Sequence, residues 1–193
     1  MNASLSLPRS PELLSRSASA LLAIDLQARL MPAIAGNSRI VWNVGRLADG
    51  ARALGVTVLA TEQNPSKLGG TIPDLAERLG SPASKLRFSC GERGELFRGL
   101  QERGIYQVLL AGVETHVCVL QTALDLQADG FRVFLAVDAT GSRSDLDRDV
   151  AFRRMGGAGV TLTTTESALF EWCEVAGTPE FRRISELAKL TPP

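Results

Sequence analysis

Short apolar runs alternate along this chain with segments in which apolar residues recur at helical spacing. The clearest runs are almost continuously apolar, which is typical of parallel strands that are covered on both faces. They predict strands over residues 20–24, 56–61, 108–113, 132–137 and 160–164. A weaker strand is predicted over residues 85–88.

The segments between these runs predict helices. Apolar residues recur at helical spacing from Ile40 to Leu54, and Gly55 then ends the helix. Similar patterns predict helices over residues 71–79, 92–103, 116–129, 144–155, 166–173 and 180–190. This alternation predicts one doubly wound (Rossmann-like) α/β domain with a six-stranded, mainly parallel sheet in the order 3-2-1-4-5-6 and helices on both faces.

Length and composition agree with a single domain. The chain has 193 residues, of which 45% are hydrophobic and 22% charged, and one core is expected at this size. We assign residues 20–193 to the domain and residues 1–19 to an N-terminal arm. The arm lacks an apolar signal core, so an arm is favoured over a cleaved transit peptide.

Charge and hydropathy exclude some partners. Lysine plus arginine equals aspartate plus glutamate at 21 each, without the basic stripe of a nucleic-acid-binding protein. No apolar run approaches the roughly 18 residues of a membrane span. We therefore expect a small-molecule substrate, with neither nucleic acid nor membrane as a partner.

The cysteines and the single histidine narrow the chemistry. Cys90, Cys118 and Cys173 cannot all pair and lack zinc-site spacing, which predicts reduced thiols in a cytoplasmic protein. Cys90 and Cys173 are interpreted as bystanders. With His116 as the only histidine, a two-histidine metal site cannot be built, and neither can a Ser-His-Asp triad whose histidine must lie apart from the nucleophile.

Three residues gather where the predicted topology places a ligand. Ligands bind beyond the carboxyl ends of neighbouring strands at the point where strand order reverses. Asp25 follows the first strand, and Cys118 follows the fourth near a helix N-terminus, which lowers the pKa of a thiol. Asp25 would accept the thiol proton and Lys85 would balance the charge, which makes an activated nucleophile without histidine. Each residue also has an ordinary explanation: core packing for Cys118, capping for Asp25 and a solvated surface for Lys85.

Five motifs in order strengthen this interpretation. They are Leu-Ala-Ile-Asp-Leu-Gln at 22–27 followed by Met31 and Pro32, Thr-Glu-Gln-Asn-Pro at 61–65, Ser-Lys-Leu-Arg-Phe-Ser at 84–89, Gly-Val-Glu-Thr-His-Val-Cys-Val at 112–119 with Gln-Thr-Ala at 121–123, and Val-Asp-Ala at 137–139 with Ser142 and Arg143. From residue 21 to about residue 170 the chain resembles the isochorismatase-like cysteine hydrolases, which include nicotinamidases and N-carbamoylsarcosine amidases. The second and fourth motifs look closest to the uncharacterised isochorismatase-domain subgroup.

The resemblance implies roles for these residues. Cys118 corresponds to the nucleophile, Asp25 to the general base, and Lys85 to the residue that orients and charge-balances them. The family's non-proline cis peptide maps to the bond between Val113 and Glu114, where it would turn a backbone amide inward. The amides of Glu114 and Cys118 would then form the oxyanion hole.

Two departures from known family members narrow the activity. Nicotinamidases carry an aspartate and histidine metal cluster after the second strand, but residues 61–70 here contain no histidine. True isochorismatases act on a vinyl ether and lack the nucleophilic cysteine, so Cys118 argues against that activity. We expect no metal and no organic cofactor.

Further residues are candidates for substrate contacts. Glu62 and Gln63 follow the second strand and would bind a polar substrate group, unless they only satisfy their own loop. Leu30 and Phe88 would wall the pocket, unless they are simple core. His116 is placed to contact substrate or a neighbouring subunit, and is a poor candidate for a catalytic base.

The predicted function is hydrolysis of an amide-type C–N bond in a small molecule through a thioester on Cys118. Family members commonly form symmetric oligomers, so a homo-oligomer is expected. Two alternatives stay open: a non-catalytic interaction or scaffold protein with this fold, and a thiol redox sensor.

Overall fold

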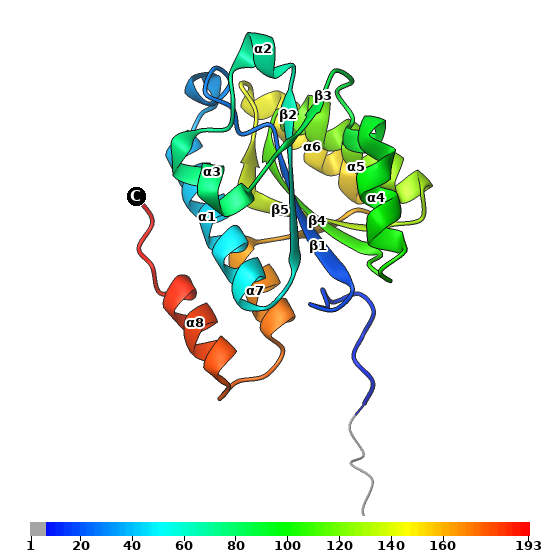
Figure 1. Cartoon of the computed structure of the whole chain (residues 1–193), viewed down its shortest axis with the longest axis vertical. Helices are drawn as coiled ribbons and strands as arrows, with labels where there is room; N and C mark the ends of the chain where they lie inside the picture. The colour runs from blue at the N-terminus through cyan, green and yellow to red at the C-terminus, as the bar shows by residue number, and fades with distance from the viewer. Residues whose placement is uncertain (1–6) are drawn as a thin grey trace, which may run out of the picture.

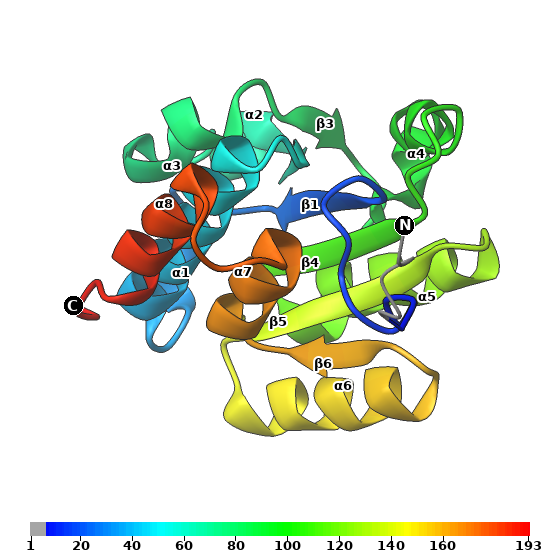
Figure 2. The same cartoon turned by 90° about the horizontal axis from the view of Figure 1, so that it is seen from below.

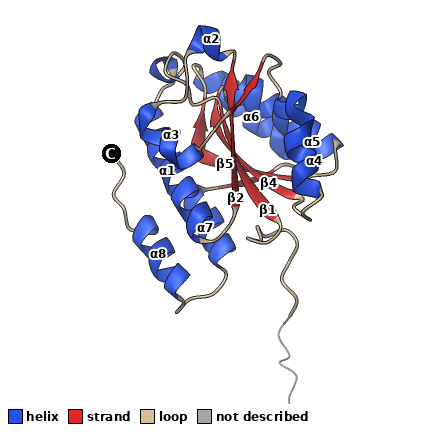
Figure 3. Cartoon of the chain, in the orientation of Figure 1, coloured by secondary structure: helices blue, strands red, loops and turns tan. Residues whose placement is uncertain are grey.

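The structure, a computed structural model, describes residues 7–193; the first six residues of the predicted arm lie outside it. Its centre is a six-stranded sheet with helices on both sides (Figures 1 and 3). The strands are β1 (Ser19–Ile24), β2 (Thr57–Gln63), β3 (Ala83–Lys85), β4 (Gln107–Val113), β5 (Arg132–Gly141) and β6 (Thr161–Thr163). Their order is β3-β2-β1-β4-β5-β6 and every neighbouring pair is parallel, which confirms the predicted topology.

The helices form two layers (Figure 2). One layer contains α1 (Asn37–Ala53), α3 (Pro73–Leu79), α7 (Thr165–Cys173) and α8 (Pro179–Ala188); the other contains α4 (Gly94–Gln101), α5 (Leu120–Ala128) and α6 (Asp145–Gly157). Short helical turns are η1 (Met31–Ala33), α2 (Pro65–Leu68), η2 (Cys90–Arg93) and η3 (Thr115–Val119). Within residues 7–193, no helix has the length and apolar character that a membrane span requires.

Burial on both faces of the sheet explains why the strands are continuously apolar. In β1, Leu21 and Ala23 belong to the core cluster with α1 and α7, whereas Leu22 and Ile24 belong to the cluster with α4 and α5. Burying a leucine or isoleucine side chain contributes about 1.5–3 kcal/mol. From Ala20 to Ile24, neither face of β1 therefore has a position that favours a polar residue.

Strand β3 lies earlier in the chain than the strand predicted over residues 85–88. β3 ends at Lys85, the residue at which the predicted strand begins. The N–H groups of Leu86 and Arg87 donate to the Glu92 carboxylate at 2.6 and 2.7 Å. This side chain draws the backbone out of the sheet directly after Lys85, so the prediction for residues 86–88 is wrong.

The described part of the predicted arm packs against the fold. Leu14 is fully buried. Arg9 donates to the Glu171 carbonyl in α7, and the Ser15 N–H donates to Gln107 Oε1 at 2.8 Å. The division into an arm and a domain stays a prediction.

Candidate active site

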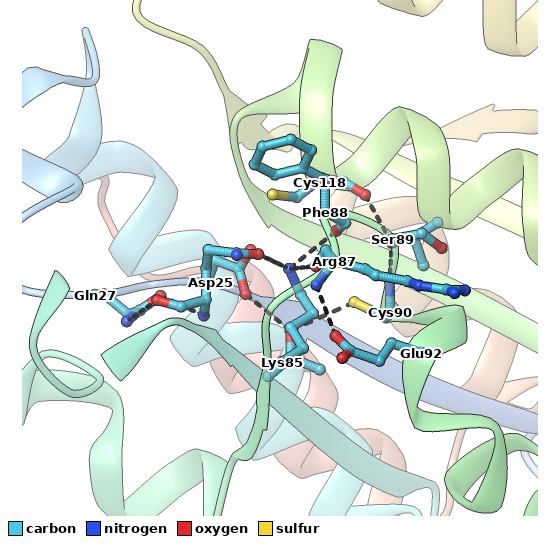
Figure 4. Close-up of polar contacts among 12 residues, drawn as sticks. Asp25, Gln27, Lys85, Arg87, Phe88, Ser89, Cys90, Glu92 and Cys118 are labelled. Carbon is cyan, nitrogen blue, oxygen red and sulfur yellow. Dashed lines mark hydrogen bonds and ion pairs between the residues drawn. The ribbon is translucent and has the colours of Figure 1, made fainter. Parts of the chain in front are cut away.

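The three residues singled out in the sequence lie together at the carboxyl edge of the sheet (Figure 4). Asp25 follows β1, Lys85 ends β3, and Cys118 lies in η3 after β4. Lys85 Nζ is 2.8 Å from Asp25 Oδ2, and both side chains are completely buried. Cys118 is 4% exposed and is close enough to feel the charges of both groups.

Asp25 stands at a backbone turn. Its φ of 57° lies in the left-handed region, which aspartate tolerates better than most residues. Its N–H donates to the Thr61 carbonyl at 3.1 Å, so the turn stays attached to the neighbouring strand. The chain thereby leaves the sheet while the carboxylate stays inside.

The ammonium group of Lys85 is fully satisfied. It donates to Asp25 Oδ2 at 2.8 Å, to Gln63 Oε1 at 2.7 Å and to the Phe88 carbonyl at 2.9 Å. Burial alone lowers the pKa of Lys85, but the charge of Asp25, with the two nearby thiols, outweighs this and raises it. A lysine has three N–H donors, and the site uses each of them to hold the charged form.

The thiol of Cys118 is held in its protonated form. Burial and the Asp25 charge raise its pKa, and the opposing effect of Lys85 is smaller. The sequence predicted that a helix N-terminus would lower the pKa of the Cys118 thiol. That prediction is wrong, because the thiol is buried beside a carboxylate. A thiolate can form here only as its proton passes to a base.

The turn before Cys118 is built differently from the prediction. No peptide bond within residues 7–193 is cis, so the bond between Val113 and Glu114 is trans and the prediction of a cis bond is wrong. Positive φ angles make the turn instead: 134° at Gly112 and 58° at Glu114. A Cβ on Gly112 would lie 2.1 Å from the Ile24 carbonyl oxygen, so only glycine lets β4 approach β1 here.

A second polar group lies beside this turn; we call its members, Glu114, His116, Arg143 and Asp147, the rim cluster. Arg143 donates to the Glu114 carboxylate at 3.1–3.3 Å. His116 Nε2 lies 3.9 Å from Glu114 and 4.0 Å from Asp147. His116 Nδ1 is hydrogen-bonded to Ser142 Oγ at 3.0 Å. The histidine thereby links the turn that carries Cys118 to the segment after β5.

The two predicted substrate residues of β2 point in different directions. Gln63 is buried; its amide oxygen accepts from Lys85, and its amide nitrogen donates to the Leu86 carbonyl at 2.7 Å. Glu62 accepts from both the N–H and the hydroxyl of Thr71 at 2.6 and 2.8 Å. Gln63 thus belongs to the site, whereas Glu62 holds the loop that precedes α3.

The two apolar candidates are also separated. Phe88 is 52% exposed, and its carbonyl accepts from Lys85 in the site (Figure 4). Leu30 packs against the core cluster on the α1 side, while Cys118 belongs to the cluster on the α5 side. Their predicted contacts with substrate stay predictions.

Sequence reasoning gave no role to two residues that lie in the site. Thr61 is buried and its hydroxyl donates to Asp25 Oδ1 at 3.0 Å. The same hydroxyl lies 3.4 Å from Cys90 Sγ, although Cys90 was interpreted as a bystander. The usable signal was the two-residue period of a strand, which places Thr61 and Gln63 on the same face of β2.

A large cavity lies elsewhere. It has a volume of about 810 Å³ and lies between α1, α3 and the C-terminal segment, with Trp42, Arg46, Leu75 and Leu190 among its lining residues. Asp25, Lys85 and Cys118 do not line it. The volume of this cavity therefore gives no information about the site that contains Asp25, Lys85 and Cys118.

The fold and the site together define the class of isochorismatase-fold α/β hydrolases. The isochorismatase domain profile matches residues 19–167, and the chain belongs to this family. It is 41% identical over 172 residues to isochorismatase domain-containing protein 2A of Mus musculus, covering 89% of this chain and 82% of that protein. It is 40% identical over 172 residues to isochorismatase domain-containing protein 1 of Salmo salar, covering 88% of this chain but only 60% of that protein.

Solved structures show the same fold. One described as MAR1 ribonuclease from Caenorhabditis elegans is 36% identical with a TM-score of 0.86, covering 94% of each chain. YcaC from Pseudomonas aeruginosa, with hexane-2,5-diol and covalent acrylamide, is 26% identical with a TM-score of 0.82, covering 93% of each chain. YcaC from Escherichia coli, described as an octameric hydrolase of unknown specificity, is 25% identical with a TM-score of 0.79, covering 87% of this chain and 85% of that one.

Proposed function

We propose that this protein is a metal-independent cysteine hydrolase that cleaves an amide-type C–N bond of a small molecule through a thioester on Cys118. The observation that carries the proposal is the buried ion pair of Lys85 and Asp25, at 2.8 Å, beside the Cys118 thiol. A buried pair of this kind is costly to maintain. Strongly perturbed groups in such an arrangement are typical of functional sites.

The first half of the reaction forms the thioester. Asp25 takes the proton from Cys118 as the sulfur attacks the carbonyl carbon of the substrate, while Lys85 keeps the charge of the pair balanced. The carbonyl oxygen becomes an oxyanion, which the backbone N–H group of Cys118 would stabilise. The Glu114 N–H is given no part in this step, because its inward orientation was predicted from a cis bond and the bond between Val113 and Glu114 is trans. Because the resting thiol is protonated, the nucleophile forms only in concert with this proton transfer.

The second half releases both products. The C–N bond breaks as Asp25 returns the proton to the nitrogen, so ammonia or an amine leaves. A water molecule then gives a proton to Asp25 and attacks the thioester carbonyl carbon. Collapse releases a carboxylic acid and restores the Cys118 thiol, and the net reaction consumes one water per C–N bond.

Three observations support a small amide as substrate. Cys118 is only 4% exposed, so a bulky group could not reach it. Phe88, whose carbonyl accepts from Lys85, offers a half-exposed apolar side chain at the site. The related YcaC of Pseudomonas aeruginosa carries covalent acrylamide, which is itself a small amide. As in the octameric YcaC of Escherichia coli, we expect copies of this chain to assemble into a homo-oligomer, in the cytoplasm.

The description of one relative as a ribonuclease suggests a second candidate, hydrolysis of RNA. The site supports it less well, since Lys85, the buried cation that lies in it, is fully engaged by Asp25, Gln63 and the Phe88 carbonyl. The chain's net charge is zero, which gives little attraction for a polyanion. RNA is therefore tested alongside the small amides, because its hydrolysis would distinguish the two candidate functions.

The test is a screen of small primary amides, carbamoyl compounds and RNA with product detection, combined with intact-mass detection of an acyl group on Cys118. Cys118→Ala should abolish turnover, and Asp25→Asn should lower it by about 10²–10⁴-fold. Cys173→Ala is the matched control, because Cys173 lies in α7 away from the site. Full turnover by either site variant would refute the mechanism. An unreactive Cys118 together with a co-purifying partner would favour the scaffold alternative. Trapping of a sulfenic acid on Cys118 after mild peroxide treatment would favour the redox-sensor alternative.

A further inference from the structure

Strand β2 supplies two side chains to the site, Thr61 and Gln63, that take no part in the proposed bond-forming and proton-transfer steps. Thr61 and Gln63 are two residues apart, so they project from the same face of the strand. In the sheet register, Thr61 lies opposite Ile24, the residue before Asp25, and Gln63 lies opposite Lys85. Each therefore reaches one member of the Asp25–Lys85 pair from a neighbouring strand.

We propose that Thr61 and Gln63 are positioning residues: Thr61 fixes the carboxylate of Asp25, and Gln63 fixes the ammonium group of Lys85, so that Asp25 is oriented to accept the proton of Cys118. This inference rests on the proposed cysteine chemistry. It assigns Gln63 to the support of Lys85 rather than to substrate binding.

Thr61 completes the contacts of the carboxylate. Asp25 Oδ2 accepts from Lys85 at 2.8 Å and Oδ1 accepts from the Thr61 hydroxyl at 3.0 Å. With a partner on each oxygen, the carboxylate plane is fixed. Without Thr61 the carboxyl group could rotate about its bond to Cβ, and a catalytic base that is misplaced by about 1 Å loses much of its rate.

Cys90 holds the Thr61 hydroxyl in this orientation. Since the hydroxyl donates its one proton to Asp25, the Cys90 thiol 3.4 Å away can only donate to it. Burial raises the pKa of Cys90, so the thiol keeps that proton. The Cys90 N–H donates to Thr122 Oγ1, which donates to the Cys118 carbonyl at 2.6 Å. The support of Asp25 is thereby joined to the turn that carries the nucleophile.

Gln63 is itself held in one orientation. Its amide nitrogen donates to the Leu86 carbonyl, so its oxygen faces Lys85. Its backbone N–H donates to Gln27 Oε1 at 2.7 Å, and its carbonyl accepts from Gln27 Nε2 at 3.0 Å. A glutamine that is fixed at both its backbone and its amide presents an immobile acceptor to the lysine.

Alkylation of Cys118 by iodoacetamide tests the proposal without a substrate. Rates are measured from pH 5 to 9 by peptide mapping, with Cys173 in the same digest as internal control. The titratable groups that face Asp25 are Lys85, Cys90 and Cys118. Thr61→Val removes the hydrogen bond that fixes the carboxylate, so the base is less well placed to accept the Cys118 proton and we expect about tenfold slower alkylation at pH 7.

Conservative variants separate positioning from a general structural effect. Thr61→Ser keeps the hydroxyl and should restore the rate. Gln63→Met removes the acceptor for Lys85 and should slow alkylation several-fold, while Gln63→Glu keeps an acceptor and should be slowed less. If Thr61→Val does not fold, judged by circular dichroism, the two Gln63 variants decide.

The outcomes distinguish this proposal from the proposed function. Slower alkylation in Thr61→Val or Gln63→Met, with no amide hydrolysed by the wild type, would support positioning and overturn the proposed function. Amide hydrolysis by the wild type, with unchanged alkylation rates in folded Thr61→Val and Gln63→Met, would overturn positioning alone. A wild-type Cys118 that is not alkylated at any pH would overturn both.

Discussion

Two polar regions lie next to the turn that carries Cys118, and they differ in how far their side chains are exposed to solvent. The buried network, which we define as Asp25, Thr61, Gln63 and Lys85, has at most 9% exposure at any member. The rim cluster also contains ion pairs, but the Arg143 side chain is 63% exposed and that of Asp147 is 53% exposed.

The difference lies in what water can replace. When a rim contact breaks, water solvates the more exposed partner, since Arg143, His116 and Asp147 are open to solvent even though the Glu114 side chain is 9% exposed; exposed pairs contribute only about 0–1 kcal/mol. When a contact of the buried network breaks, no water is available to replace the lost partner, and the cost is several-fold larger. The buried network is therefore suited to fixing the geometry of proton transfer, and the rim cluster to contacts that change when a substrate or a second subunit arrives.

Gly112→Ala should have the largest effect, because it separates the strands on which both regions depend. The new Cβ would lie 2.1 Å from the Ile24 carbonyl oxygen at a φ of 134°, so the backbone must move. We expect a loss of more than about 4 kcal/mol in the free energy of unfolding, measured by urea denaturation. Gly104→Ala is the control, since Gly104 also has a positive φ, 74°, but nothing lies within 4 Å of a Cβ there. Equal losses in the two variants would show that the close approach of β1 and β4 is unimportant.

Lys85→Met should come next, because it leaves the Asp25 carboxylate buried without a counter-charge. We expect a loss of about 3–5 kcal/mol in unfolding free energy at pH 7. The double variant Asp25→Asn with Lys85→Met should lose less than the single one, since it removes the unpaired charge as well. A double variant as unstable as the single one would mean that packing, not charge, accounts for the loss.

The sequence predicted the sheet because its strongest signal is local. Both faces of β1, β4 and β5 are covered, so apolar runs mark them directly, and glycines such as Gly55 mark the ends of helices. β3 was placed too late because its end depends on Glu92, a residue beyond the strand that captures two of the backbone N–H groups. A hydropathy pattern carries no information about such a contact.

The site was predictable to the extent that topology determines it. Asp25 and Cys118 follow the neighbouring strands β1 and β4, and Lys85 ends β3, which β2 separates from β1, so the parallel strand order brings all three residues to one edge. The raised pKa of Cys118 was not predictable, because it depends on burial and on the Asp25 charge rather than on a helix end. Thr61 and Cys90 were missed because each acts only through a neighbour that is distant in the sequence.

Alkaline pH offers a graded test of the buried network. The pKa values of Lys85, Cys90 and Cys118 are all raised in the folded protein, so between the ordinary and the raised values the folded state binds more protons than the unfolded chain. Stability must then fall as pH rises above about 8.5, where unfolded thiols begin to ionise. Urea denaturation from pH 7 to 10 should show this fall, and the double variant Cys90→Ala with Cys118→Ala should fall less steeply. Equal slopes would show that neither thiol contributes.

Arg143→Ala should have the smallest effect and sharpens the comparison from the other side. Arg143 holds the Glu114 carboxylate at 3.1 Å, yet its own side chain is 63% exposed. We expect a loss of less than about 1 kcal/mol at low ionic strength, and a smaller loss in 0.5 M NaCl because salt screens exposed charges. Urea denaturation at the two salt concentrations measures both. A loss of 3 kcal/mol or more, insensitive to salt, would place the Glu114–Arg143 pair with the buried network. Solvent exposure would then not be what separates the two regions, and the nucleophile turn would depend on its rim as much as on its core.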